Sequence, residues 1–219
     1  LDAGKTEEII PAIVTEAVNS IPFPKRMKWS NKKLTFPRPI NYFVLMFNDR
    51  LIPFEIEGIT AGTRTRGHFV QFNRMVEIEK ISFYEKILND NGVILNQDDR
   101  KEKIRRALAD AAVKAGGILN EDEDLLDTVT YLVEQPYIAT CHFNPDFLKI
   151  PDIVLITEMK EHQKNFAILD QNGRLMNSFL AVSNNPVTAF IIRGNVKVIS
   201  ARFKDAGFFY TEDAKLKLA

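Results

Sequence analysis

The sequence predicts an α+β fold in which a largely antiparallel sheet is accompanied by grouped helices. Short apolar runs suited to strands are separated by turn signals such as NDR at 48–50 and DQNGR at 170–174. Segments with helical spacing follow one another between residues 82 and 134 instead of alternating with single strands. Because strict alternation of strand and helix is the mark of a parallel sheet, this grouping favours antiparallel pairing.

Composition limits the class of protein. The chain of 219 residues is long enough for one large domain or one and a half ordinary ones, and its 45% hydrophobic content can fill a core. Lys plus Arg and Asp plus Glu both total 29, so the net charge gives no global argument for nucleic acid or membrane. The single cysteine, Cys141, excludes an internal disulfide framework and favours a reducing cytoplasm. Since no apolar run is long enough for a membrane span and no signal peptide is present, we expect a cytoplasmic protein without a membrane partner.

The first part of the chain is predicted to form a helix and a hairpin. Residues 6–20 have apolar positions near helical spacing, although Pro11 is expected to confine the regular helix to the residues after it. The runs 40–47 and 51–59 are typical of two strands around the NDR turn, which predicts a hairpin.

The rest of the chain is predicted to add helices and further strands. Asp98 and Asp99 are available to cap a helix that follows them. The predicted segments are helices at 82–89, 98–115 and 122–134, strands at 136–142 and 165–169, a helix that starts at Asp152, and helical spacing over 195–210.

The strongest local charge lies between Glu16 and Asp49, where six basic residues occur without an acidic one and give a local charge of +6. Trp29, Phe36 and Tyr42 interleave with the cations, a combination that could bind phosphates and stack on exposed bases. The alternative is an ordinary solvated loop whose charge is balanced elsewhere. The six residues are Lys25, Arg26, Lys28, Lys32, Lys33 and Arg38.

Residues 64–72 alternate in the manner of a strand, so Arg64, Arg66 and His68 are predicted to share one face and Thr65 to lie on the other. An exposed face with two or three positive groups would attract an anion. The same row of charges would be costly if it pointed inward.

The segment ITEMKEHQKNF at 156–166 raises the question of an acid/base site. Glu158 and His162 are four residues apart, which places them on one face of a helix. Leu155, Met159 and His162 also form a stripe at i, i+4 and i+7. The alternative to catalysis is therefore a histidine that packs on this stripe or faces the helix C-terminus.

Motifs for nucleotide or metal chemistry are missing from the sequence. The ten glycines are scattered, without GxxxxGK[ST] or GxGxxG, and the three histidines show no HExxH. Cys141 and His142 are neighbours in a predicted strand and so point to opposite faces, which prevents a thiol–imidazole pair. We expect Cys141 to be buried. We also expect neither a cofactor nor a metal site in this segment.

Seven strings of the chain carry a family resemblance: PKRMKW, FPRPINYFV, TRTRGHFVQF, DDRKEKIRR, ITEMKEHQKNFAILD, LAVSN and ISARFKDAGFFYTED. In this order and at these intervals, from about Ile21 to Asp213, they resemble the β subunit of bacterial glycyl-tRNA synthetase. TRGH and MKEHQKNF are the most unusual of them. One departure is Asn165, which stands where an aromatic residue is common in the family.

The resemblance implies a role within a larger enzyme. In that family an α/β heterotetramer attaches glycine to tRNA(Gly) with ATP. It implies that the α subunit holds the glycine and ATP site, whereas β supplies tRNA binding and is needed for activity. This segment would resemble in fold the editing domain of the phenylalanyl-tRNA synthetase β subunit. An HD-type domain and an anticodon-binding domain would lie beyond it, since the segment is expected to be a piece of a longer chain.

Three regions are predicted on this basis. Residues 1–29 form an N-terminal helical and basic segment, residues 30–195 an editing-domain-like module that binds tRNA, and residues 196–219 a helix that leads into a following domain. The leading expectation is a tRNA- and subunit-contacting module that is inactive alone. The alternatives are an editing hydrolase acting on mischarged tRNA through Glu158 and His162, and a structural spacer.

Specific residues are expected to carry these roles, with none assigned to catalysis or to a metal. The expected RNA-binding residues are Lys25, Arg26, Lys28, Lys32, Lys33, Arg38, Arg64, Arg66, His68, Lys160 and Lys164, and the family-motif residues whose role is left open are Glu158, His162, Arg202 and Asp205.

Overall fold

A computed structural model describes residues 5–29 and 31–215 and divides the chain into two compact units. The first unit ends at Asn91 and the second begins at Gly92. Within the described residues, six α-helices and several small, mostly antiparallel sheets confirm the predicted α+β class. The boundaries predicted after residues 29 and 195 do not coincide with this division. Packing sets the units, and the last helix places Ile199 and Phe203 in the core of the second one.

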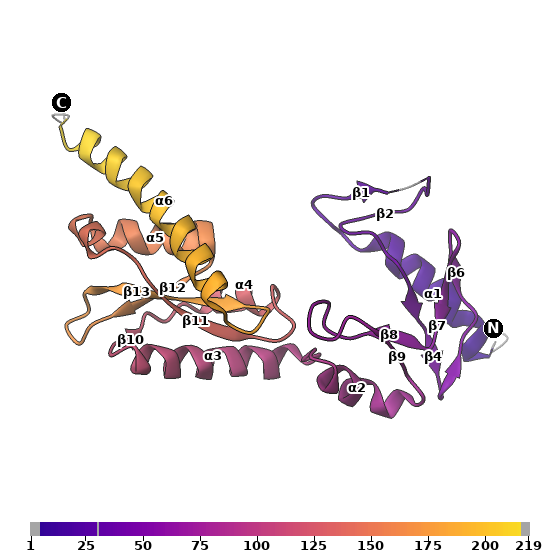
Figure 1. Cartoon of the computed structure of the whole chain (residues 1–219). Coiled ribbons are helices and arrows are strands. Elements are labelled where there is room, and N and C mark those ends of the chain that lie inside the picture. Colours follow the sequence, from indigo (N-terminus) through magenta and orange to yellow (C-terminus); the bar gives the residue numbers. More distant parts are fainter. Residues whose placement is uncertain (1–4, 30, 216–219) are drawn as a thin grey trace. The chain divides into compact units, whose positions relative to one another are not determined.

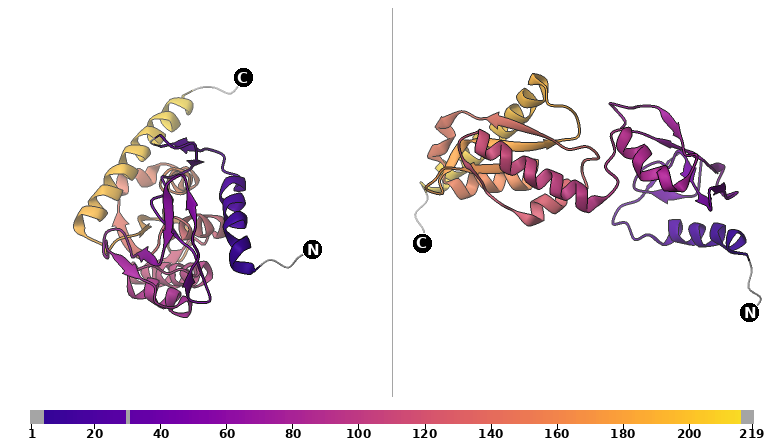
Figure 2. Two further views of the ribbon diagram at one scale, coloured as in Figure 1. Left: turned by 90° about the vertical axis from the view of Figure 1, so that its right-hand side faces the viewer. Right: turned by 90° about the horizontal axis from the view of Figure 1, so that it is seen from below.

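The first unit combines helix α1, Thr6–Ser20, with short strands. The prediction that Pro11 confines the regular helix to later residues is wrong, because α1 begins before Pro11 and passes through it. Proline lacks one backbone donor, and the packing of Val14 and Val18 against strand residues offsets this loss. Figure 2 shows α1 in indigo beside the strands of this unit. The other elements are β1 (Met27–Lys28), β2 (Thr35–Phe36), β3 (Phe43–Val44), β4 (Met46–Phe47), β5 (Arg50–Leu51), β6 (Glu55–Ile56), β7 (Ile59–Gly62), β8 (Arg64–Arg66), β9 (Met75–Glu77), the 3₁₀ turn η1 (Ile81–Phe83) and α2 (Tyr84–Asp90).

Tight two-residue turns form two of the strand connections in the first unit. Asn48 and Asp49, with φ of 47° and 60°, join β4 to β5. Glu57 and Gly58, with φ of 49° and 82°, join β6 to β7. Positive φ at both loop residues is the geometry that two-residue hairpins favour. The predicted hairpin is therefore confirmed beside its NDR turn, but β3 pairs in parallel with β7 and the two runs do not pair along their whole length.

The second unit is a four-stranded antiparallel sheet between two layers of helices (Figure 1). The strand order is β10-β12-β13-β11. Helices α3 and α4 pack on one face, and α5 and α6 pack on the other. The elements are α3 (Gln97–Lys114), β10 (Ile118–Leu119), α4 (Glu123–Thr130), β11 (Tyr137–His142), η2 (Pro145–Lys149), α5 (Asp152–Gln163), β12 (Phe166–Leu169), β13 (Leu175–Ser183) and α6 (Ala189–Asp213).

Side-chain alternation along the strands fills both layers. Cys141 and Phe179 are cross-strand partners on the face toward α5 and α6, and both are fully buried. Leu180, the next residue of β13, is buried on the face toward α3 and α4. Cys141 is buried in the core, as predicted, and burial raises the pKa of its thiol to about 11.

Two details of the second unit differ from the sequence prediction. Asn96, not Asp98 or Asp99, caps α3, because its side-chain oxygen accepts the backbone N–H groups of both aspartates. Helix α6 starts at Ala189, earlier than the predicted spacing, with Thr188 as its cap. Within the described ranges, none of the helices combines the length and apolar character needed to cross a membrane.

Candidate nucleic-acid interface

The basic segment of the first unit is held as a small hairpin. Strand β1 pairs with β2 so that Lys28 lies opposite Thr35. Leu34, just before β2, is buried against the strand core and anchors this hairpin to the unit. The basic side chains are thereby attached to a folded element.

Four of the six cations in this segment extend into solvent. Their residues are exposed, and their side chains form no ion pair within the described part of the chain. A cation in this state is free to exchange its counterions for a phosphate group. We call these four residues the open cations: Lys25, Lys28, Lys33 and Arg38.

The other two cations of the segment are occupied. The Arg26 guanidinium donates hydrogen bonds to the carbonyl oxygens of Asn19, at 3.2 Å, and Ile21 at the C-terminal end of α1. A cation at this position also complements the helix dipole. The Lys32 ammonium donates to the carbonyl oxygen of Glu57. These two residues therefore help to fix the segment in place.

The aromatic residues are arranged differently from the expectation of base stacking. Trp29 packs against the strand core, and Phe36 makes an edge-to-face contact with Phe23 at 4.8 Å between ring centroids. Tyr42 is 38% exposed, and its hydroxyl accepts the backbone N–H of Arg66 at 3.1 Å. The aromatic side chains that interleave with the cations therefore serve mainly to pack the segment.

Arg64, Arg66 and His68 do not share one exposed strand face, contrary to the prediction. Both arginines are exposed, with Thr65 buried between them. The prediction for His68 is wrong, because β8 ends at Arg66 and His68 is fully buried. Its Nδ1 atom accepts the backbone N–H groups of residues 70 and 71 at 3.3 and 3.2 Å, so the ring organises the following turn.

An exposed aromatic residue next to these arginines was not predicted to be functional. Phe69 is 63% exposed, and the guanidinium carbon of Arg66 lies 5.9 Å from its ring centroid. Because alternation along a strand would place Phe69 on the face opposite Arg66, the sequence did not predict the contact between them. A cation beside an exposed ring suits a base and its phosphate together. Arg64, in contrast, lies 3.9 Å from Glu77.

In the second unit, Lys160 is engaged in an ion pair. Its ammonium lies 2.5 Å from the Asp122 carboxylate, which caps α4 through the Leu125 N–H. Burial tends to raise the pKa of Asp122, but the hydrogen bonds from Lys160 and Leu125 outweigh it and leave this pKa lowered. The same hydrogen bond from Lys160 raises the pKa of the ammonium. Lys160 thus connects α5 to the start of α4.

The end of α5 explains the second lysine of the motif. Lys164 adopts the left-handed conformation, φ 54°, and its N–H donates to the Lys160 carbonyl oxygen. Its ammonium lies 3.9 Å from Glu161. Asn165 follows, nearly fully buried, and its N–H donates to the Met159 carbonyl oxygen. Lys164 therefore ends the helix.

Glu158 and His162 do come together, but at a partly exposed position. The His162 Nε2 atom lies 3.7 Å from a Glu158 oxygen, and the histidine side chain is 48% exposed. Leu155 and Met159 are fully buried, so the prediction that His162 continues their stripe is wrong. A 3.7 Å contact is longer than a hydrogen bond suited to proton transfer.

The remaining family-motif residues, Arg202 and Asp205, are exposed on α6. They are three residues apart on a helix that buries Ile199 and Phe203. Their exposure separates them from the core of the second unit.

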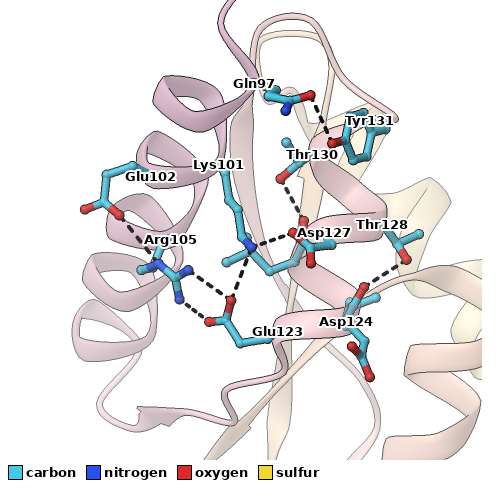
Figure 3. A network of polar contacts seen from close by, with 12 residues as sticks. Gln97, Lys101, Glu102, Arg105, Glu123, Asp124, Asp127, Thr128, Thr130 and Tyr131 are labelled. Carbon is cyan, nitrogen blue, oxygen red and sulfur yellow. Dashed lines mark hydrogen bonds and ion pairs between the residues drawn. The ribbon is translucent and has the colours of Figure 1, made fainter.

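Two cations on α3, Lys101 and Arg105, are likewise paired. Lys101 lies 2.5 Å from Asp127 and 3.4 Å from Glu123, and Arg105 binds Glu123 and approaches Glu102 at 3.5 Å (Figure 3). The Arg105 hydrogen bond is the main cause that lowers the pKa of Glu123 to about 2. Sequence reasoning missed this network. A signal was present, since Lys101 and Arg105 are four residues apart, as are Glu123 and Asp127.

Comparison with known proteins places the chain among the aminoacyl-tRNA synthetase subunits. A family model described as "Glycyl-tRNA synthetase beta subunit" matches residues 2–219, so the chain belongs to this family.

Curated relatives agree with the family assignment. The chain is 40% identical to the glycine–tRNA ligase beta subunit of Clostridioides difficile (strain 630), covering 99% of this chain and 32% of the relative. It is 41% identical to that of Thermodesulfovibrio yellowstonii, covering 96% and 31%. It is 40% identical to that of Bacillus subtilis (strain 168), covering 98% and 32%. The chain therefore spans about a third of the length of these relatives.

Proposed function

We propose that this chain supplies part of the tRNA-binding surface of a cytoplasmic glycyl-tRNA synthetase. The single observation that supports this most is the set of open cations on and beside the β1–β2 hairpin, in a chain that belongs to the β-subunit family. Arg66 and Phe69 extend the proposed surface. Lys160 is left out because Asp122 engages it, and His68 because it is buried.

In this proposal the segment positions tRNA(Gly) and neighbouring parts of an α/β assembly, whereas glycine and ATP bind to the α subunit. The second unit corresponds in fold to the editing domain of the phenylalanyl-tRNA synthetase β subunit, without its activity. An antiparallel sheet flanked by helices is compatible with that likeness, and a shared fold does not carry over a reaction. The exposed Glu158–His162 contact gives no support to hydrolysis.

The test replaces Lys25, Lys28 and Arg38 together by alanine in the β subunit of the α/β enzyme. Each phosphate contact releases counterions, so the slope of log Kd against log salt should fall by about two to three units. Binding should weaken more at low salt than at high salt. An unchanged slope in filter binding or fluorescence titration would show that these cations do not contact RNA.

A separate expectation is that the 219-residue chain alone forms neither glycyl-adenylate nor glycyl-tRNA. It contains no glycine-rich phosphate-binding motif. The measurement is glycine-dependent pyrophosphate exchange with the purified chain, with the α/β enzyme as the positive control. Exchange above background would contradict the assignment of catalysis to the α subunit.

A further inference from the structure

The β1–β2 hairpin with its flanking open cations, residues 25–29 and 31–38, is called the basic hairpin, and one acidic residue accepts hydrogen bonds from its backbone. The Glu57 carboxylate accepts the backbone N–H of Lys33 at 2.6 Å and that of Leu34 at 3.0 Å. Its own carbonyl oxygen accepts the Lys32 ammonium. Glu57 therefore binds three consecutive residues from a distant part of the sequence.

The backbone of Glu57 is unusual for its residue type. It has φ of 49° in the two-residue turn between β6 and β7, a position that favours glycine or asparagine. Glycine already occupies the second turn position, Gly58. A glutamate here tolerates an unfavourable conformation, and the carboxylate hydrogen bonds to the hairpin offset the cost.

Strand pairing links the Glu57 contact to the open cations. Leu34 precedes β2, and β2 pairs with β1 so that Thr35 lies opposite Lys28. At the other end of the segment, the Arg26 guanidinium is bound to carbonyl oxygens at the end of α1. The segment is thus fixed at both ends, while the open cations between and beside these points remain exposed.

We propose that Glu57 is a positioning residue that pre-orders the basic hairpin for RNA. This inference rests on the proposed function of the hairpin. It makes a prediction opposite to simple electrostatics, because removal of a carboxylate near a phosphate-binding surface should otherwise strengthen RNA binding. Loss of the ordering contacts should instead weaken it, since binding must then order the hairpin.

The experiment uses Glu57→Gly in the full-length β subunit with its α partner. Glycine favours the positive φ of this position, so the β6–β7 turn can keep its conformation when the carboxylate is removed. Glu16→Ala, at an exposed residue of α1, removes the same charge as a matched control. Glu57→Gln keeps one acceptor oxygen and should give an intermediate result.

Two readouts are expected to change together. Hydrogen exchange at the Lys33 and Leu34 amides should accelerate in Glu57→Gly, and tRNA binding should weaken by about 3- to 10-fold. In the Glu16→Ala variant, amide exchange should be unchanged. Its binding of tRNA should be unchanged or slightly tighter.

Three results would overturn the inference in distinguishable ways. Unchanged amide exchange would show that Glu57 does not order the hairpin. Faster exchange with unchanged or tighter tRNA binding would remove the positioning role, while leaving the hairpin as the RNA contact if Lys25, Lys28 and Arg38 still matter. If the triple alanine variant binds tRNA normally, the RNA role of the hairpin fails, and the role of Glu57 fails with it.

Discussion

The basic segment of the first unit and the ion-pair network around α3 and α4 of the second unit use their charged residues in different ways. In the second unit, Lys101, Arg105 and Lys160 each contact a carboxylate that belongs to another helix or its cap. In the first unit, the open cations of the basic hairpin have no such carboxylate in the described part of the chain. A charge that is already paired stabilises the fold, whereas an unpaired one is available to a ligand.

Their cores differ as well. The sheet of the second unit includes a nine-residue strand, β13, and has a buried cluster on each face. The strands of the first unit are two to four residues long, and its buried cluster of Leu34, Phe54 and Ile56 is smaller. The second unit therefore has the larger core, whereas the first exposes its basic segment on a smaller one.

The largest effect is expected when a buried phenylalanine is replaced by alanine in each of the two cores. Phe179→Ala should lower the free energy of unfolding by about 3–5 kcal/mol, because this side chain is fully buried in the second unit. Phe54→Ala should cost less, about 2–3 kcal/mol, since its smaller core can collapse more easily. Urea denaturation of the chain measures both. A larger cost for Phe54→Ala would reverse the proposed difference between the units.

The next prediction separates paired from unpaired cations. Replacement of Lys101, Arg105 and Lys160 by methionine removes as much positive charge as the triple alanine variant of the hairpin. The thermal midpoint should fall because the ion pairs are lost, whereas the salt slope of tRNA binding should change by less than about half a unit. A slope change equal to that of the hairpin variant would mean that net charge, not placement, controls binding.

A smaller effect should appear in acid. The pKa of Glu123 is about 2 in the folded chain, below its ordinary value of 4.5, so its ion pairs stabilise the folded state above about pH 4.5. This contribution is lost as the pH falls toward 2. Glu123→Gln should therefore flatten the pH dependence of stability in this window. Glu85→Gln, at an exposed residue of α2, serves as the control and should leave the profile unaltered.

The smallest effect is expected at His162. Since its side chain is half exposed and its contact with Glu158 is 3.7 Å, His162→Gln should change stability by no more than about 0.5 kcal/mol. Hydrolysis of mischarged tRNA by the α/β enzyme should be equally unaffected. A wild-type deacylation rate above the uncatalysed one that disappears in this variant would favour the editing hydrolase.

Periodicity in the sequence predicted most of the second unit. Helices near 98–115 and 122–134 and strands at 136–142 and 165–169 were placed correctly to within a few residues. These elements are long or strongly patterned, so local signals agree with tertiary packing. The cap at Asn96 was missed because two aspartates beside it were equally plausible.

The first unit was harder to predict, for physical reasons. Its strands are so short that alternation cannot define where they end, and the strand predicted over 64–72 ends at Arg66. The exposure of the basic segment was expected from its charge, but the occupation of Arg26 and Lys32 by carbonyl oxygens was not. Those contacts come from residues distant in sequence or from a helix end, and no local pattern reveals them.

The most direct test of the central claim is lysine footprinting of the α/β enzyme with and without tRNA(Gly). An amine-reactive reagent and mass spectrometry report how strongly each lysine is protected. We expect tRNA to protect Lys25, Lys28 and Lys33, while Lys101 and Lys160, already paired with carboxylates, change little. Reactivity of the three hairpin lysines that is the same with and without tRNA would contradict it.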